Sequence, residues 1–232
     1  MTSLKVPNLN GCSNFGGIAC NGKNDIYCIK TKQDDTVSTI YVFKDGKYKG
    51  SRKFTGKMGH GNGLTFHDGK VYVATSSNII QSVDISKWTR VSLSAPFSIG
   101  GIAHYRDDEF LVRSGSKVYI LKEDDNVMYK VGSIEIKNPF KENGYSVAQD
   151  ICYNNGRIYL VYSRLDKKKN CILAYDLKGS IRGSIFSEES PELFEWETAC
   201  WVDKKTMLIG ANTSTGDFIF TKTAPFNAFL NY

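Results

Sequence analysis

The chain has 232 residues, of which 41% are hydrophobic and 23% charged, proportions that are ordinary for a soluble globular protein. Its net charge of +6 is modest, and no basic stripe with interleaved aromatic residues emerges, which argues against a nucleic-acid partner. No apolar run approaches the length of a membrane span, so no integral membrane segment is expected. Residues 1–7 lack the apolar core of a secretory signal, which leaves the cytoplasm and export by a non-classical route both open.

In chain order, the sequence repeats a pair of short strands joined by a tight turn. An arm rich in Asn, Gly and Ser spans residues 1–14, and the first unit begins near Phe15. The clearest copy is the segment 59–75, in which Asp68-Gly69 separates two alternating apolar runs, the strongest short hairpin signal. The equivalent positions of the five copies are spaced by 46, 38, 49 and 47 residues, and they are Ile18, Leu64, Ile102, Ile151 and Thr198.

Repeats of about 40 to 50 residues made only of strands are typical of β-propeller blades. We therefore predict an all-β, five-bladed β-propeller with four-stranded antiparallel blades, forming a single domain over residues 1–232. The blades are predicted near residues 15–54, 59–96, 98–136, 146–186 and 194–232. Either Leu4–Val6 or the tail 226–232 is expected to close the ring as an outer strand. The segments 138–145 and 187–193 are expected to be loops, the second with a helical turn.

The first strand of each blade is expected to line the central axis, with every second side chain facing it. At one level these predicted axial residues are all small, namely Ala19, Thr65, Ala103, Cys152 and Ala199. Two residues earlier, three blades have glycine and two have a carboxylate, namely Gly17, Gly63, Gly101, Asp150 and Glu197. Because three blades contribute no side chain there, we expect an open, acidic pocket at this mouth of the channel.

The candidate ligand-binding residues around this pocket are His60, Asn62, Gln149, Asp150, Glu195, Trp196 and Glu197. The carboxylates would accept hydrogen bonds from sugar hydroxyls, the amides and His60 would orient the ligand, and Trp196 would stack on a sugar ring. Structural roles stay open for each group. The carboxylates suit solvated strand entrances, His60 suits a loop hydrogen bond, and Trp196 suits packing between blades.

Signatures of other chemistry are absent from the sequence. There is no phosphate-binding glycine motif, no zinc spacing and no GxSxG elbow, so no cofactor is expected, although Ca²⁺ in the acidic mouth stays open. Asp150 and Glu197 are the candidate catalytic pair, because glycoside hydrolysis uses two carboxyl groups about 5 to 9.5 Å apart. The layout resembles five-bladed propeller glycosidases. Those enzymes place three acids on three blades, where this chain has glycines, and they have longer loops.

The six cysteines are Cys12, Cys20, Cys28, Cys152, Cys171 and Cys200. No CxxC pair occurs, and most of the six occupy apolar strand positions, which favours buried free thiols. An even count also suits disulfides in a secreted chain, so the sequence leaves their pairing undecided.

The segment 59–75 also carries a family resemblance. It has His60 and Asn62 before an apolar strand and Ala74-Thr75 at the end of the next strand. In this it resembles the helveticin J-like proteins, large bacteriocins of Gram-positive bacteria and their relatives, whose version reads His-Ala-Asn-Asp before the strand. Gly63 stands where the family has Asp, so any role of that carboxylate is missing here or has moved to Asp150. The resemblance implies a bacterial propeller that binds or acts on cell surfaces.

Three functions follow as hypotheses. The favoured one is a monomeric propeller that binds a glycan or another small polar ligand at the mouth of its channel. The first alternative is a glycosidase-type hydrolase that uses Asp150 and Glu197, and the second is a protein-interaction scaffold with an inert channel. The sequence does not identify the ligand.

Overall fold

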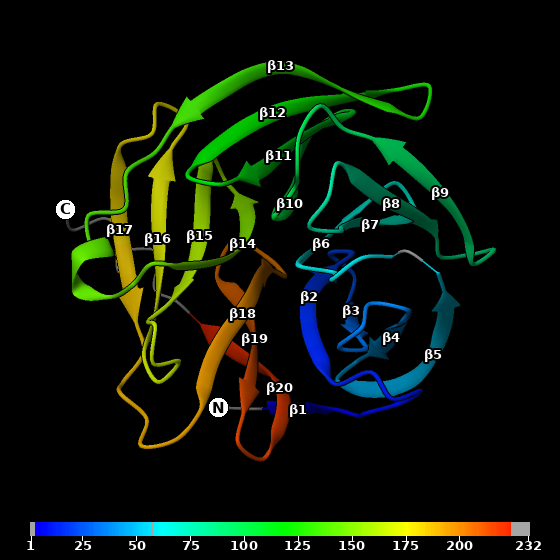
Figure 1. The fold of residues 1–232 in the computed structure, drawn as a ribbon, viewed down its shortest axis with the longest axis horizontal. Coiled ribbons are helices and arrows are strands. Elements are labelled where there is room, and N and C mark those ends of the chain that lie inside the picture. The colour runs from blue at the N-terminus through cyan, green and yellow to red at the C-terminus, as the bar shows by residue number, and fades with distance from the viewer. Residues whose placement is uncertain (1–2, 57, 224–232) are drawn as a thin grey trace.

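The computed structural model describes residues 3–56 and 58–223, and these residues fold almost entirely into strands (Figure 1). The strands are β1 (Ser3–Val6), β2 (Asn14–Cys20), β3 (Asp25–Thr31), β4 (Val37–Lys44), β5 (Lys47–Thr55), β6 (Gly63–His67), β7 (Lys70–Ala74), β8 (Ile79–Asp84), β9 (Thr89–Ser94), β10 (Gly101–Arg106), β11 (Glu109–Ser114), β12 (Lys117–Asp124), β13 (Val127–Glu135), β14 (Val147–Asn154), β15 (Arg157–Ser163), β16 (Asn170–Asp176), β17 (Ile181–Phe186), β18 (Phe194–Trp201), β19 (Thr206–Thr213) and β20 (Gly216–Thr223). Between β13 and β14 lies a short 3₁₀ turn, η1 (Lys141–Asn143). Within the described ranges, no helix has the length and apolar character needed to cross a membrane.

Tight turns connect consecutive strands, and their residues have the backbone conformation that such turns require. In the turn between β6 and β7, Asp68 and Gly69 have φ angles of 43° and 73°. Asn155 and Gly156 between β14 and β15 behave in the same way, with 48° and 77°. Two successive residues with positive φ define the type I′ hairpin turn, so the Asp-Gly signal read from the sequence matches the turn that forms.

Hydrogen bonding groups the strands into four sheets. Three sheets have four strands each, in the orders β2-β3-β4-β5, β14-β15-β16-β17 and β1-β20-β19-β18. The fourth has eight strands, formed by the antiparallel units β6–β9 and β10–β13. One parallel residue pair, Val127 with Ser94, joins these two units. The prediction of an all-β fold with four-stranded antiparallel sheets is therefore confirmed, whereas the sheet pattern does not by itself give five separate blades.

The first strands of the units face a common centre (Figure 1). Contacts run from β2 to β6, β10, β14 and β18 and back to β2. We call these five strands the inner ring. Apolar side chains fill the spaces between neighbouring units, as where Ile18 of β2 and Leu208 of β19 share one buried cluster. Burial between units, rather than within one unit, therefore stabilises the fold.

The first and last described strands lie in one sheet. Strand β1 pairs antiparallel with β20, and Leu4 lies opposite Ile219. The N-terminal arm thus supplies the outer strand of the last unit, as one of the two predicted options proposed. The other option, the tail 226–232, lies outside the described residues. The prediction of a helical turn in 187–193 was wrong, since the short 3₁₀ turn forms instead at residues 141–143.

Candidate functional site

Asp150 of β14 lies inside the inner ring and touches three other inner strands. Its Oδ2 accepts a hydrogen bond from Thr198 Oγ1 of β18 at 2.6 Å, and its Oδ1 accepts one from the Ile151 N–H at 2.7 Å. The same Oδ1 lies 2.4 Å from the position that a Cβ on Gly63 of β6 would occupy, and 3.0 Å from that on Gly101 of β10. The carboxyl group is therefore packed against the glycine backbones across the ring.

The predicted open pocket at Asp150 is not present. Asp150 is fully buried. The glycines Gly63 and Gly101 leave space, as expected, but the carboxyl group of Asp150 fills that space. Any side chain at Gly63 would collide with it, because non-bonded heavy atoms do not approach to 2.4 Å. Asp150 thus closes the ring at this level and does not meet a substrate, so it is not a candidate for catalysis in this conformation.

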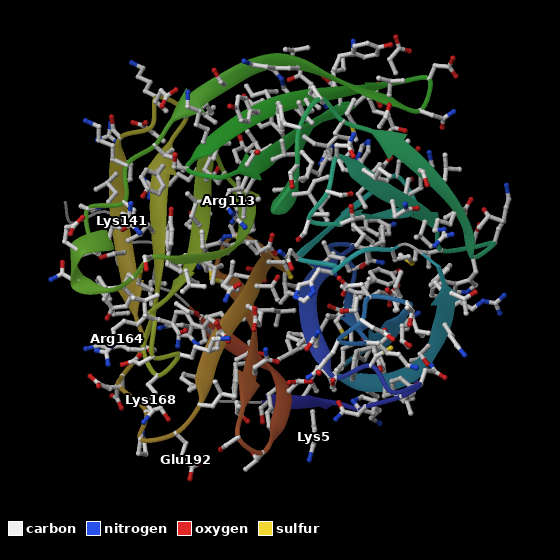
Figure 2. The ribbon with its side chains drawn as sticks, viewed as in Figure 1. Lys5, Arg113, Lys141, Arg164, Lys168 and Glu192 are labelled. Carbon is white, nitrogen blue, oxygen red and sulfur yellow. The ribbon has the colours of Figure 1, made fainter. Side chains whose placement is uncertain are left out.

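The environment of Asp150 favours its neutral form. Burial raises the pKa of Asp150 to about 8, although the Thr198 hydroxyl, the Ile151 N–H and the charge of Arg113 oppose the shift. Arg113 of β11 lies beside the inner strands (Figure 2) and donates from Nη2 to the carbonyl of Gln149 at 2.8 Å. Its Nε is buried without a hydrogen-bond partner among the described residues. Asp150 and Arg113 therefore form a structural polar layer inside the ring.

A second group of polar side chains lies toward the start of β18, and it is partly open to solvent. Glu195 accepts a hydrogen bond from Gln149 Nε2 at 2.8 Å and pairs with Lys167 Nζ at 2.9 Å. Glu197 accepts one from Asn212 Nδ2, and the charge of Glu195 acts on the carboxyl group of Glu197. We call these five residues the acidic cluster.

Part of the acidic cluster is buried and part of it is exposed to solvent. Glu195 is 2% exposed, whereas the side chain of Lys167 is 53% exposed. Gln149, Glu197 and Asn212 are half-buried. The acidic cluster therefore borders solvent through Lys167 and the half-buried side chains.

Protonation in the acidic cluster is uneven. Burial raises the pKa of Glu197 well above its usual value, and the charge of Glu195 raises it further. The bond to Glu195 raises the pKa of Lys167. Burial and the repulsion between the two carboxylates both favour the protonated form of Glu197. A protonated carboxyl beside an ionised one is the arrangement that suits acid–base chemistry.

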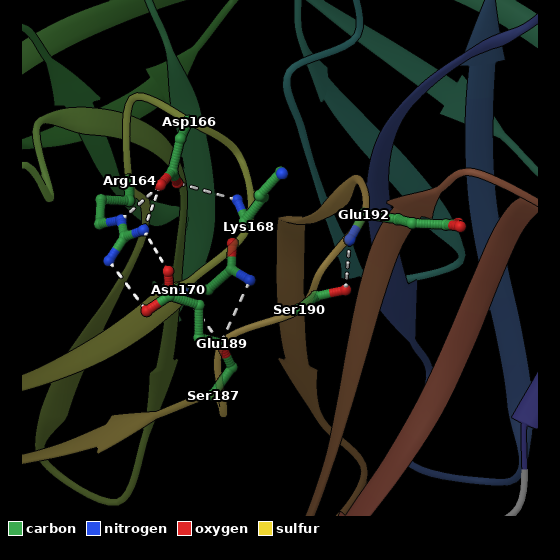
Figure 3. Close-up of polar contacts among 8 residues, drawn as sticks. All are labelled: Arg164, Asp166, Lys168, Asn170, Ser187, Glu189, Ser190 and Glu192. Atoms are coloured by element: carbon green, nitrogen blue, oxygen red, sulfur yellow. Dashed lines mark hydrogen bonds and ion pairs between the residues drawn. The ribbon is translucent and has the colours of Figure 1, made fainter.

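Lys167 belongs to the loop between β15 and β16. This loop contacts the loop between β17 and β18 through Arg164 and Glu189 (Figure 3). In the loop between β15 and β16, Arg164 pairs with Asp166, and it also reaches Glu189 of the loop between β17 and β18 at 2.8 Å. The Phe194 N–H donates to the Lys167 carbonyl at 2.9 Å. The backbone at Lys167 is thus held by contacts between these two loops, and its ammonium group pairs with Glu195.

The remaining predicted site residues lie elsewhere. His60 Nδ1 is 3.1 Å from Asp35 Oδ1, and its imidazole is 47% exposed toward the turn between β3 and β4. Asn62 is half-buried directly before β6. Trp196 is 5% exposed and belongs to a buried cluster that joins Ile209 of its own unit to Val161 and Ile172 of the preceding unit. The packing alternative for Trp196 is therefore the one observed, and its ring does not face the mouth of the channel.

Of the seven predicted ligand-binding residues, the structure brings Gln149, Glu195 and Glu197 together. Lys167 and Asn212 were not predicted. Asn212 lies directly across from Glu195 in the pairing of β18 with β19, so a correct strand register would have identified it. Lys167 belongs to a run of three lysines and carries no signal of its own in the sequence.

No metal site is evident in the part of the chain that the structure describes. Within residues 3–56 and 58–223, no group of three or more His, Cys, Asp or Glu side chains is arranged to hold an ion. The ammonium of Lys167 already neutralises Glu195, at the place where a calcium ion would need free carboxylate oxygens. Calcium binding at this mouth stays a prediction.

No family model matches this chain, and no curated protein matches it either. Among solved structures, the chain is similar to a glutaminyl cyclase from Myxococcus xanthus, with 10% identity, a TM-score of 0.64 and coverage of 97% of this chain and 96% of that one. Two weaker similarities are to apo AztD from Citrobacter koseri (15% identity, TM-score 0.42, 78% of this chain and 49% of that one) and to the computationally designed Ika8 protein (12%, 0.46, 90% and 71%). At 10% identity the likeness to the cyclase concerns the fold alone, and along nearly its full length the chain shares a propeller-like fold with an enzyme.

Proposed function

We propose that this protein is a five-bladed β-propeller that binds a small, hydroxyl-rich ligand of the glycan class at the acidic cluster. The count of five rests on reading the eight-stranded sheet as two blades. A single residue pair links its halves, Val127 with Ser94, whereas each half has its own inner strand in the ring, β6 or β10. A bridge between two outer strands does not merge two blades into one.

The observation that carries the function is the mixture of donors and acceptors in the acidic cluster. The carboxyl groups of Glu195 and Glu197 accept hydrogen bonds, and the amides of Gln149 and Asn212 and the ammonium of Lys167 donate them. Each sugar hydroxyl is both a donor and an acceptor, so adjacent hydroxyls fit alternating groups of this kind. The ligand would replace bonds that the cluster now makes internally, which keeps the cost of leaving polar groups unpaired low.

The resemblance of residues 59–75 to helveticin J-like proteins points to a cell-surface glycan as the source of the ligand. His60 and Asn62, which carry that resemblance, precede β6, and β6 contacts β2 in the inner ring. We propose that they extend the binding face, while Trp196 supports it from below as a packed residue. A monomer is sufficient for this site, because all five residues of the cluster come from one chain.

Glycan-array binding followed by calorimetry on a hit tests the proposal. Glu195→Gln and Asn212→Ala are expected to weaken binding at least tenfold, because each removes a hydrogen-bonding partner worth about 1.5 to 3 kcal/mol when charged groups are involved. Glu142→Gln, an exposed carboxylate in η1, is the matched control and should bind as the wild type does. A parallel titration with calcium and with a chelator tests the predicted ion. Equal affinity of Glu195→Gln and wild type would refute the site, and an array without hits would leave the scaffold hypothesis standing.

A second candidate function is acid–base catalysis by Glu195 and Glu197. The raised pKa of Glu197 beside Glu195 and the fold shared with a glutaminyl cyclase favour it. A hydrolase acting through Asp150 and Glu197 is not supported, since Asp150 is fully buried. A panel of aryl glycosides and of peptides with N-terminal glutamine would test turnover. Loss of turnover in Glu197→Gln with retained binding would favour the enzyme.

A further inference from the structure

The other end of the inner ring contains a cavity that the proposed function does not use. It has a volume of about 160 Å³ and is lined by the C-terminal parts of all five inner strands. The lining includes three cysteines, Cys20 of β2, Cys152 of β14 and Cys200 of β18. All six cysteines of the chain are free thiols. The cavity therefore gathers half of them at one place.

Cys20 and Cys200 are paired across two neighbouring strands. The Ile18 N–H donates to Thr198 Oγ1 at 3.1 Å, which sets β2 beside β18 in a register that brings the residues two positions later level with each other. Cys20 Sγ donates to the Trp201 carbonyl at 3.0 Å. Cys200 lines the same cavity, and each of these two thiols has the largest single effect on the pKa of the other. Strands β2 and β18 belong to the first and the last unit of the ring.

The two thiols differ in reactivity. Cys20 is half-buried at the cavity. The neighbouring Cys200 thiol lowers the pKa of Cys20 to about 7, helped by the Gly22 N–H and opposed by burial and by the charge of Asp203. The neighbouring Cys20 thiol and burial raise the pKa of Cys200. A thiolate is the nucleophile in thiol exchange, so Cys20 is suited to attack first and Cys200 to resolve.

We propose that Cys20 and Cys200 form a redox-active thiol pair that reacts with a low-molecular-weight disulfide entering this cavity. The Cys20 thiolate attacks one sulfur of the disulfide RSSR, forms the mixed disulfide Cys20–S–S–R and releases one thiolate RS⁻. The Cys200 thiol passes its proton to that thiolate and attacks Cys20 Sγ, which forms the Cys20–Cys200 disulfide and releases a second RS⁻. The protein loses two electrons, and the small disulfide gains them to become two thiols.

The consequence for the fold is a covalent lock between the first and last units. The non-covalent closure is the pairing of β1 with β20, and the proposed disulfide would add a bond between β2 and β18. Cys20 and Cys200 are about 180 positions apart in the sequence, like the adjacent hydrogen-bonded pair Ile18 and Thr198. A disulfide between them would therefore strongly restrict the unfolded chain. Oxidation is therefore expected to raise the melting temperature.

The test uses the full chain, reduced and then incubated with bis(2-hydroxyethyl) disulfide without denaturant. Peptide mass spectrometry under non-reducing conditions should identify a Cys20–Cys200 link, and the melting temperature should rise with its formation. Cys200→Ser should stop at Cys20 carrying one hydroxyethylthio group. Cys20→Ser should slow modification of Cys200 at least tenfold. Cys152→Ser, a thiol lining the same cavity, is the matched control and should form the link at the wild-type rate.

Several results would overturn the proposal. One is a wild-type protein in which Cys20 stays free while other thiols react. Another is a link between Cys152 and either partner, and a third is a reaction that requires prior unfolding in urea. The wild-type time course decides these points even if a serine variant fails to fold.

Discussion

The buried carboxyl of Asp150 should make the stability of this protein fall as the pH rises through neutrality. Its pKa is about 8 in the folded chain, against an ordinary value of 3.8. Between those values the native state keeps the proton and the unfolded chain loses it. The native state therefore binds more protons, and the free energy of unfolding decreases with increasing pH.

The magnitude follows from one proton per molecule, about 1.4 kcal/mol for each pH unit between about 4 and 8. Asp150→Asn cannot ionise, so it escapes this loss. The free energy of unfolding of the variant minus that of the wild type should rise by about 3 kcal/mol between pH 5 and pH 7. Loss of the ideal contact with Thr198 would shift the whole difference without changing its slope.

Urea unfolding at pH 5, 6 and 7 measures this difference directly. Asp203→Asn is a suitable control, because the backbone N–H groups of Lys205 and Thr206 lower the pKa of Asp203 and it is ionised throughout this range. Its difference from the wild type should stay flat. A flat or falling difference for Asp150→Asn would mean that Asp150 is ionised in the fold and that the charge of Arg113 outweighs burial.

Two further predictions concern the packing of the ring. Gly63→Ala should destabilise the protein by about 1 to 3 kcal/mol in thermal or urea unfolding, because its Cβ would lie 2.4 Å from a buried carboxyl oxygen. The control Gly132→Ala should cost little, because its Cβ would lie 3.3 Å from the end of a side chain. Equal losses of stability in the two variants would contradict the packing argument. Asp217→Asn should lower the free energy of unfolding by about 3 to 5 kcal/mol, because it leaves the fully buried ammonium of Lys30 without its ionised partner. The control Glu135→Gln breaks an exposed pair and should lower it by at most about 1 kcal/mol. Similar values for both variants would show that the buried pair is not needed.

The strands could be predicted well, because turn residues and alternating apolar residues within a short segment are sufficient to indicate a hairpin. Asp68-Gly69 has the positive φ angles that its hairpin requires, and the arm at Leu4–Val6 pairs with the last unit. The sheet pattern was less predictable, since the bridge between Val127 and Ser94 depends on how two outer strands meet. The sequences of β9 and β13 contain no pattern that predicts this contact.

The candidate site was predicted only in part, and the errors have a common cause. Glycines at the inner ring were interpreted as empty space, but the space beside Gly63 belongs to the side chain of Asp150. Trp196 was assigned to the mouth although it packs between units. Lys167 reaches Glu195 through contacts between two loops. Each case turns on which neighbour a residue meets across the ring, and a single sequence does not specify that.

Bulges explain why strict alternation failed where the site lies. The register of β18 with β19 shifts between Trp196 and Thr198, which leaves Glu197 as the extra residue. In β14 the register shifts between Ala148 and Ile151, so Gln149 and Asp150 share one position opposite the partner strand. One of them turns outward to the acidic cluster and the other inward to the ring. A bulge redirects side chains and is enriched beside functional sites. Two neighbouring inner strands bulge at residues of the acidic cluster, and β2 bulges at the same end of the ring, between Phe15 and Ile18. This backbone geometry supports the proposal that the ligand binds at this end of the ring.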